Sequence, residues 1–153
     1  MLYLNVHHLR RHIETLSYSL TLYQQAPIGD IQQEVYRNAI VKGFELTQEV
    51  AFKLLRKALK AFGHGGKKLE TLFVKDLIRL AAAHGLMELD AAERWFKYRD
   101  NRNDTAHDYG VGFAEETLAL IAPFLLDLNQ LAATLEQKFG PETPDANAKV
   151  DPQ

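Results

Sequence analysis

The chain has 153 residues, of which 46% are hydrophobic, so it is long enough for one domain with a sizeable core. Its formal net charge of −2 excludes a uniformly basic surface and confines any nucleic-acid contact to a local patch. The sequence contains no cysteine, which excludes disulfides and thiolate metal sites and fits a reducing cytoplasm.

No part of the sequence is expected to enter a membrane. Residues 1–11 lack the apolar stretch of a secretory signal peptide. The longest apolar run, Leu118–Leu126, has nine residues and contains Pro123. A membrane-spanning helix needs about 18 apolar residues or more. We therefore expect a soluble, cytoplasmic protein.

Apolar residues recur with helical spacing along nearly the whole chain, and no strand alternation or internal repeat is visible. A first helix is predicted from about Val6 to Gln25, with Asn5 as its cap. A second, long helix starts at Asp30, which together with Gln33 resembles a capping box, and it stops at the flexible segment Gly63–Gly66.

The second half of the chain continues this helical pattern. A third helix is predicted over Leu69–His84 and is closed by Gly85 as its C-cap. A fourth begins near Asp90. A fifth covers about Phe113–Phe139, and Pro123 should kink or divide it, because proline removes a backbone hydrogen bond inside a helix.

The fold class is therefore all-α: an up-and-down bundle of about five helices, similar to a four-helix bundle. Residues 1–139 form the bundle domain. Residues 140–153 are polar, contain three prolines and offer almost nothing to bury, so we expect a disordered tail.

The segment Arg102–Tyr109 gathers an arginine, a histidine and a tyrosine into eight residues, in the pattern R-x(4)-H-x-Y. Arg102 is a permanent cation that can hold a phosphate through two parallel hydrogen bonds. His107 can give or take a proton near neutral pH. The pattern indicates phosphodiester chemistry, in which Asn103 can orient a phosphate or the imidazole. Tyr109 adds a hydroxyl that can itself be modified.

The spacing of this motif leaves two arrangements open. On one unbroken helix, Arg102 and His107 would point about 140° apart. Either the helix breaks near Asp104, or the pair is completed across a dimer. Asp104 and Thr105 are both favourable N-cap residues, which favours a break.

The segment Trp95–Tyr109, WFKYRDNRNDTAHDY, resembles the signature of HEPN-domain proteins. It is most similar to the branch called nucleotidyltransferase substrate-binding proteins. A second match lies upstream, where Phe44–Glu49 resembles the F-E-x-T-x-E segment of that branch. The chain departs from the branch at Gln48 and Phe52, where phenylalanine and tryptophan are frequent. The resemblance covers roughly residues 5–139.

This resemblance implies a helical homodimer whose motifs face a shared cleft. It implies a ribonuclease toxin that needs no metal or other cofactor, with Arg102 and His107 as its catalytic pair. The implied partner is a cognate minimal nucleotidyltransferase, an antitoxin that attaches AMP to Tyr109. The residue chemistry fits attack of a ribose 2′-OH on the adjacent phosphorus, in which His107 moves the proton and Arg102 stabilises the developing negative charge.

Two other functions remain open for the same residues. In the first, the chain is a non-catalytic subunit that presents a substrate or nucleotide to a nucleotidyltransferase, with Arg102 as a phosphate clamp. In the second, it is a structural helical dimer. Its motif then only fixes a helix end, through salt links of Arg102, a hydrogen-bonded His107 and a packed Tyr109.

A basic stripe lies on the second helix, where Lys53, Arg56, Lys57 and Lys60 are spaced at i, i+3, i+4 and i+7. It could hold RNA or an acidic partner, or it could be the solvated side of an amphipathic helix. Glu49 could support the cleft, but it also precedes Lys53 by four residues, the favourable orientation for an ion pair.

No metal site is predicted. His8 and His12 are four residues apart, a spacing that can grip zinc on a helix, but no third ligand of suitable spacing follows them. The chain also lacks the G-S and D-x-D motifs of a nucleotidyltransferase and any glycine-rich phosphate loop.

Overall fold

The protein is described by a computed structural model over residues 3–105 and 111–140, with side chains described at 3–101 and 114–140. Within these ranges the chain forms six α-helices and one short 3-10 helix, so the predicted all-α bundle is confirmed. The tail predicted at 140–153 lies outside the described residues except for its first residue.

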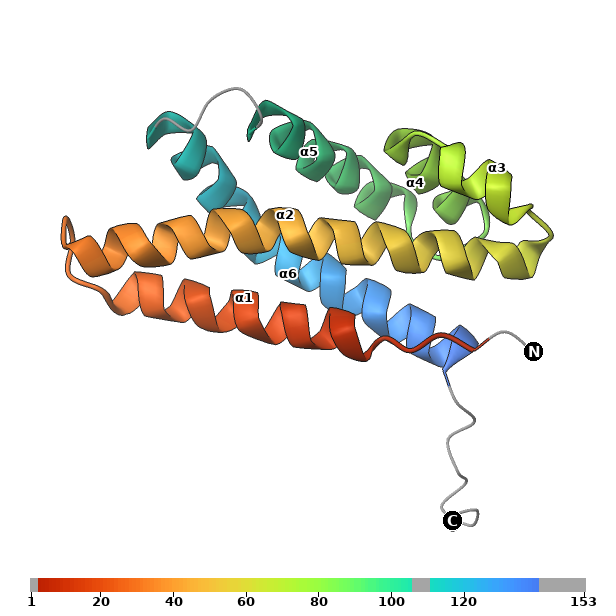
Figure 1. Cartoon of the computed structure of the whole chain (residues 1–153), viewed down its shortest axis with the longest axis horizontal. Helices are drawn as coiled ribbons and strands as arrows, with labels where there is room; N and C mark the ends of the chain where they lie inside the picture. The colour runs from red at the N-terminus through yellow and green to blue at the C-terminus, as the bar shows by residue number, and fades with distance from the viewer. Residues whose placement is uncertain (1–2, 106–110, 141–153) are drawn as a thin grey trace, which may run out of the picture.

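The helices are α1 (His7–Gln25), α2 (Ile31–Leu59), α3 (Gly66–Thr71), α4 (Val74–Ala83), α5 (Leu89–Thr105) and α6 (Val111–Phe139), and a 3-10 turn, Lys60–Phe62, follows α2. The long α1 and α2 form an antiparallel pair, and α6 crosses behind them (Figure 1). The shorter α3 and α4 cover the end of α2, and α5 lies above its middle (Figure 1).

Aromatic side chains join α2, α5 and α6 in the centre of the bundle. The ring of Phe124 meets those of Phe44, Tyr98 and Trp95 edge to face, with centroid distances of 4.7, 5.0 and 5.6 Å. All four side chains are fully buried. Such rings contribute both buried area and favourable edge-to-face geometry, so they fix α5 against α2 and α6.

Two predicted helix caps, Asp30 and Gly85, are confirmed, whereas Asn5, the predicted cap of α1, lies one residue before the N-cap Val6. The Asn5 side chain accepts a hydrogen bond of 2.8 Å from the His7 N–H at the start of α1. Asp30 is the N-cap of α2 and accepts from the Gln32 N–H at 3.4 Å. Gly85, after α4, has a φ of +76°, which glycine adopts without strain.

The prediction of one helix over Leu69–His84 is wrong, because the chain turns at residues 72–73 and forms two helices, α3 and α4. The Arg56 guanidinium donates to the carbonyls of Leu69 and Leu72, at 3.0 Å in both cases. A side chain from α2 thus satisfies carbonyls that a continuing helix would have bonded.

The last helix, α6, is not divided at Pro123 but runs from Val111 to Phe139. By length and composition alone, its segment Ala114–Phe139 could cross a membrane, with a mean hydropathy of 1.6. The core helix of a soluble protein passes the same test. Here α6 buries Ile121, Phe124 and Leu128 completely within the bundle.

Candidate functional site

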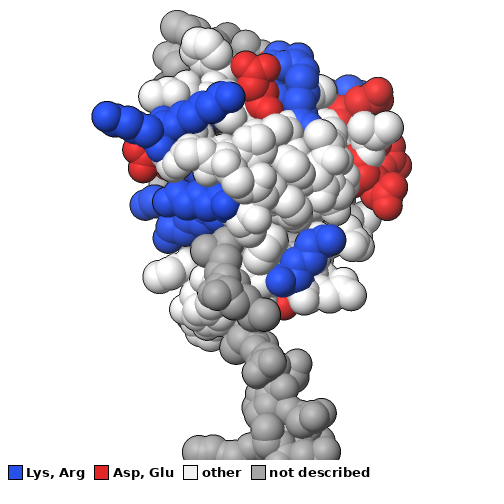
Figure 2. Space-filling model, turned by 90° about the vertical axis from the view of Figure 1, so that its right-hand side faces the viewer, with Lys and Arg blue, Asp and Glu red and all other residues white. Residues whose placement is uncertain are grey.

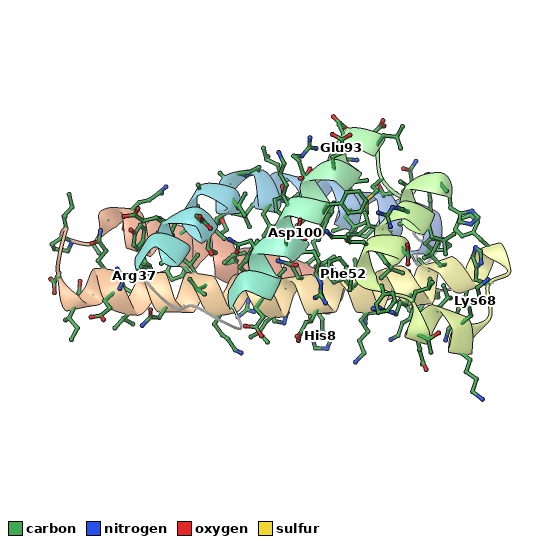
Figure 3. The ribbon with its side chains drawn as sticks, turned by 90° about the horizontal axis from the view of Figure 1, so that it is seen from above. His8, Arg37, Phe52, Lys68, Glu93 and Asp100 are labelled. Carbon is green, nitrogen blue, oxygen red and sulfur yellow. The ribbon has the colours of Figure 1, made fainter. Side chains whose placement is uncertain are left out.

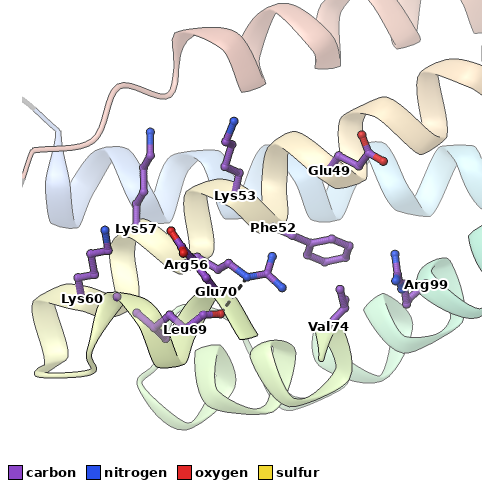
Figure 4. A pocket seen from close by; sticks show the side chains of 11 residues that line it. Glu49, Phe52, Lys53, Arg56, Lys57, Lys60, Leu69, Glu70, Val74 and Arg99 are labelled. Atoms are coloured by element: carbon purple, nitrogen blue, oxygen red, sulfur yellow. Dashed lines mark hydrogen bonds between the residues drawn. The ribbon is translucent and has the colours of Figure 1, made fainter. Parts of the chain in front are cut away.

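A hollow of about 630 Å³ lies between α2, α3 and the residues of α4 and α5 that face them (Figure 4). We call it the basic hollow. It is lined by Glu49, Phe52, Lys53, Arg56, Lys57, Lys60, Gly66, Leu69, Glu70, Val74 and Arg99. Five of these side chains are cationic and two are anionic, so the hollow is locally basic although the whole chain is slightly acidic.

The basic stripe predicted on the second helix lines this hollow, together with Glu49. Lys53, Lys57 and Lys60 are exposed. Arg56 has a different role, since its guanidinium bonds the end of α3 (Figure 4, dashed line). The stripe therefore divides into three lysines that reach solvent and one arginine that holds the opposite wall.

The charge distribution around this end of the bundle is uneven. The largest groups of Lys and Arg side chains lie on the left, with others at the top and lower right, and the largest group of Asp and Glu side chains lies on the right (Figure 2). Because the field of a local cluster can attract a ligand of opposite charge, a basic face is possible in a protein of net negative charge.

The hollow extends toward the part of α5 that carries the predicted catalytic motif. Glu49 and Arg99 lie at one end of it and Lys60 at the other (Figure 4). Seen from above, α5 runs obliquely across α2 (Figure 3). Arg99 precedes Arg102 on α5 by three residues, or about 4.5 Å of helix rise. The hollow thus ends about one helical turn before the motif.

The motif itself is only partly described. Arg102 and Asn103 belong to the last turns of α5, and their side chains are not described. His107 and Tyr109 lie outside the described residues. Asp104 and Thr105, expected as N-caps of a new helix, instead belong to α5.

Two buried hydrogen bonds hold α5 just before the motif. Gln48 Nε2 of α2 donates to the Tyr98 carbonyl at 3.1 Å. Thr117 Oγ1 of α6 donates to Asn101 Oδ1 at 3.0 Å. No role was predicted for these residues from the sequence. Each is a polar residue on an otherwise apolar stripe of its helix. Because buried polar groups need hydrogen-bond partners, this pattern could have indicated contacts between helices.

A second polar network joins α5 to α6. Arg94 donates two hydrogen bonds of 2.8 Å to the carboxylate of Asp127. Tyr98 Oη donates to the same carboxylate at 2.5 Å. Burial of the Tyr98 phenol, together with this hydrogen bond to Asp127, raises the pKa of Tyr98 above its ordinary value. The network orients α5, and it too was not predicted from the sequence.

Two histidines outside the motif, His64 and His84, contact each other. His64 Nε2 and His84 Nε2 are 2.9 Å apart, and the ring of Phe62 stacks on His84 at 4.3 Å. These contacts hold residues 62–64, which follow α2, against the end of α4. Over residues 3–101 and 114–140, no three histidine or carboxylate side chains gather closely enough to hold a metal ion.

Residues 4–137 match the family described as nucleotidyltransferase substrate binding protein like. The chain belongs to this family. Its membership confirms the family predicted from the segments Phe44–Glu49 and Trp95–Tyr109.

Known proteins similar to this family member include a curated relative and two solved structures. A Haemophilus influenzae protein named probable ribonuclease HepT is 27% identical over 113 residues, which are 71% of this chain and 76% of that protein. An H. influenzae structure is described as the fold of a substrate binding domain of a nucleotidyltransferase. It has a TM-score of 0.74 at 24% identity and covers 87% of this chain and 100% of that one. A crystal structure from Thermus thermophilus gives a TM-score of 0.67 at 25% identity, over 83% and 98% of the two chains.

Proposed function

We propose that the protein is a metal-independent endoribonuclease that acts as a toxin, with Arg102 and His107 as its catalytic residues. The observation that carries this proposal is the R-x(4)-H pattern, which begins at the end of α5 in a member of this family. The relative named a probable ribonuclease supports the same activity. The basic hollow beside α5 suits a polyanionic substrate.

The proposed reaction is a transfer within the RNA strand. His107 accepts the proton of a ribose 2′-OH, and the 2′-oxygen forms a bond to the adjacent phosphorus. The bond from phosphorus to the 5′-oxygen breaks, and that oxygen takes up a proton from the imidazolium or from water. Arg102 stabilises the negative charge that builds up on the phosphorane oxygens. The products are a 2′,3′-cyclic phosphate and a 5′-hydroxyl.

The proposal includes a homodimer, a cytoplasmic location and silencing by a partner. A cognate minimal nucleotidyltransferase would transfer AMP from ATP to the Tyr109 hydroxyl, with release of pyrophosphate. The attached phosphodiester carries a negative charge two residues from His107 and would compete for the phosphate position at Arg102. An unchanged intact mass after incubation with the partner and ATP would contradict this part.

The mechanism is tested by the chemistry of the fragments. Purified protein is incubated with single-stranded RNA in excess chelator, and the fragment ends are analysed. We expect cleavage to persist and to leave cyclic phosphate and 5′-hydroxyl ends. Fragments with 5′-phosphate ends, or a loss of cleavage on chelation, would contradict the proposed mechanism.

A second candidate is the non-catalytic subunit that presents a substrate to a nucleotidyltransferase. The family description and the description of the similar Haemophilus structure favour it. This candidate differs from the first in turnover. A presenting subunit would retain RNA or nucleotides without cleaving them, and it would raise the activity of the nucleotidyltransferase on the bound substrate.

A further inference from the structure

The lysines of the basic hollow follow one another along the last turns of α2 and into the 3-10 turn after it. Lys53, Lys57 and Lys60 are separated by four and three residues, which correspond to about 6 and 4.5 Å of helix rise. All three are exposed, and they stand along one side of the hollow (Figure 4). Their ammonium groups thus form a row parallel to α2, suited to a ligand with several anionic groups in succession.

The three lysines border a hollow and not a flat solvated face, because α3 lies opposite them. Phe52 and Leu69 are buried beneath it, and Arg56 fixes α3 through two backbone carbonyls. Because Arg56 is committed to α3, its substitution would disturb the wall as well as the charge. Neutralising the three lysines instead lowers the charge of the hollow and leaves both of these hydrogen bonds in place.

The two carboxylates of the hollow add hydrogen-bond acceptors to its lining. Glu49 and Glu70 line the same space as the lysines. A strand of RNA offers both phosphates for the lysines and ribose hydroxyls that can donate to carboxylates. The mixed lining therefore has partners for both the phosphates and the ribose hydroxyls of RNA.

We infer that the basic hollow binds a single-stranded RNA segment that flanks the scissile phosphate, with Lys53, Lys57 and Lys60 contacting its backbone phosphates. The hollow ends at Arg99, three residues before Arg102, so a strand lying in it leads toward the motif. The inference rests on the proposed function for the identity of the strand as substrate. It assigns the hollow to substrate binding and not to catalysis.

The test measures RNA affinity as a function of salt, using a labelled oligouridine and a His107→Ala background that prevents cleavage. The variant K53Q/K57Q removes two charges from the hollow. Its matched control, K97Q/K138Q, removes two exposed lysines that do not line the hollow. Each lost phosphate contact lowers the slope of log K against log salt by about 0.7 for a single strand, so we expect a decrease of about 1.4 for K53Q/K57Q and no change for the control.

An unchanged slope in K53Q/K57Q, or an equal decrease in K97Q/K138Q, would overturn the inference. Melting temperatures equal to that of the parent protein show that both variants are folded. The inference and the proposed function fail separately. If the wild-type protein cleaves RNA and K53Q/K57Q keeps its slope, only the inference fails. If the slope falls but the wild-type protein does not cleave RNA, the proposed function fails, and the hollow remains an RNA-binding site whose strand is not a substrate.

Discussion

Asp127 is the residue on which the link between α5 and α6 depends. Its carboxylate is nearly inaccessible and accepts hydrogen bonds from both Arg94 and Tyr98. Charge-assisted hydrogen bonds of this kind are shorter and stronger than neutral ones. Arg94 keeps part of its surface in water, so the cost of desolvation falls mainly on the carboxylate and the phenol.

Asp127→Asn should therefore destabilise the protein. It removes the charge that both donors share, and we expect the free energy of unfolding to fall by about 2 kcal/mol, measured by urea denaturation. Asp90→Asn is the control, because Asp90 is exposed and 3.6 Å from the same arginine, and its loss should cost below about 0.5 kcal/mol. Equal losses in the two variants would contradict a special role of Asp127.

Tyr98 should make the fold sensitive to alkali. Burial and the hydrogen bond to Asp127 raise its pKa in the folded protein, whereas in the unfolded chain the pKa has its ordinary value near 10. The stabilisation that the Tyr98 hydroxyl contributes is complete below pH about 10. It is lost as the pH rises above this value, because the tyrosine of the unfolded chain releases its proton first. In urea titrations at increasing alkaline pH, we expect a shallower loss of stability in Tyr98→Phe than in the wild type. Tyr18→Phe, at an exposed tyrosine, should retain the wild-type slope.

At the scale of the helices, α3 depends on a side chain from α2. Arg56→Gln cannot reach both carbonyls that the guanidinium bonds, so we expect α3 to open more easily and the protein to lose about 1–2 kcal/mol of stability. Hydrogen exchange should accelerate in the amides of Gly66–Thr71. Lys57→Gln, at the exposed neighbouring position, should leave exchange in α3 unchanged. Unchanged exchange in Arg56→Gln would show that α3 is held by other contacts.

The same helix shows what the sequence can and cannot predict. Apolar spacing and cap residues such as Asp30 are local signals, and they predicted the long helices to within a few residues. At the turn at residues 72–73, the Leu72 carbonyl bonds Arg56, which is distant in sequence, so no local pattern reveals this contact.

The candidate site, too, could be predicted only in part from the sequence. The spacing of Lys53, Lys57 and Lys60 predicted a basic stripe, but the hollow exists only because α3 forms a wall opposite α2. Gln48 and Asn101 have polar neighbours in the sequence and stand out only on their helix stripes, whose other members are mostly apolar. Their partners, Tyr98 and Thr117, belong to other helices and follow only from the tertiary packing.

At the scale of the whole molecule, the proposed homodimer is directly measurable. The chain has a mass of 17.4 kDa, so light scattering of the purified protein should give about twice this value if the assembly has the two-fold symmetry common among soluble oligomers. A mass equal to that of one chain at micromolar concentration would contradict the dimer. The ribonuclease proposal would then require a site within one subunit.

The proposed function requires that this family member cleaves RNA with His107. The measurement that tests it most directly is the rate of RNA cleavage by the wild-type protein and by His107→Ala, with Tyr109 shown to be unmodified by mass. Loss of a positioned general acid or base lowers rates by about 10²–10⁴-fold, and we expect a decrease of this size with an unchanged melting temperature. Equal cleavage by both proteins, or none by the wild type, would contradict the claim.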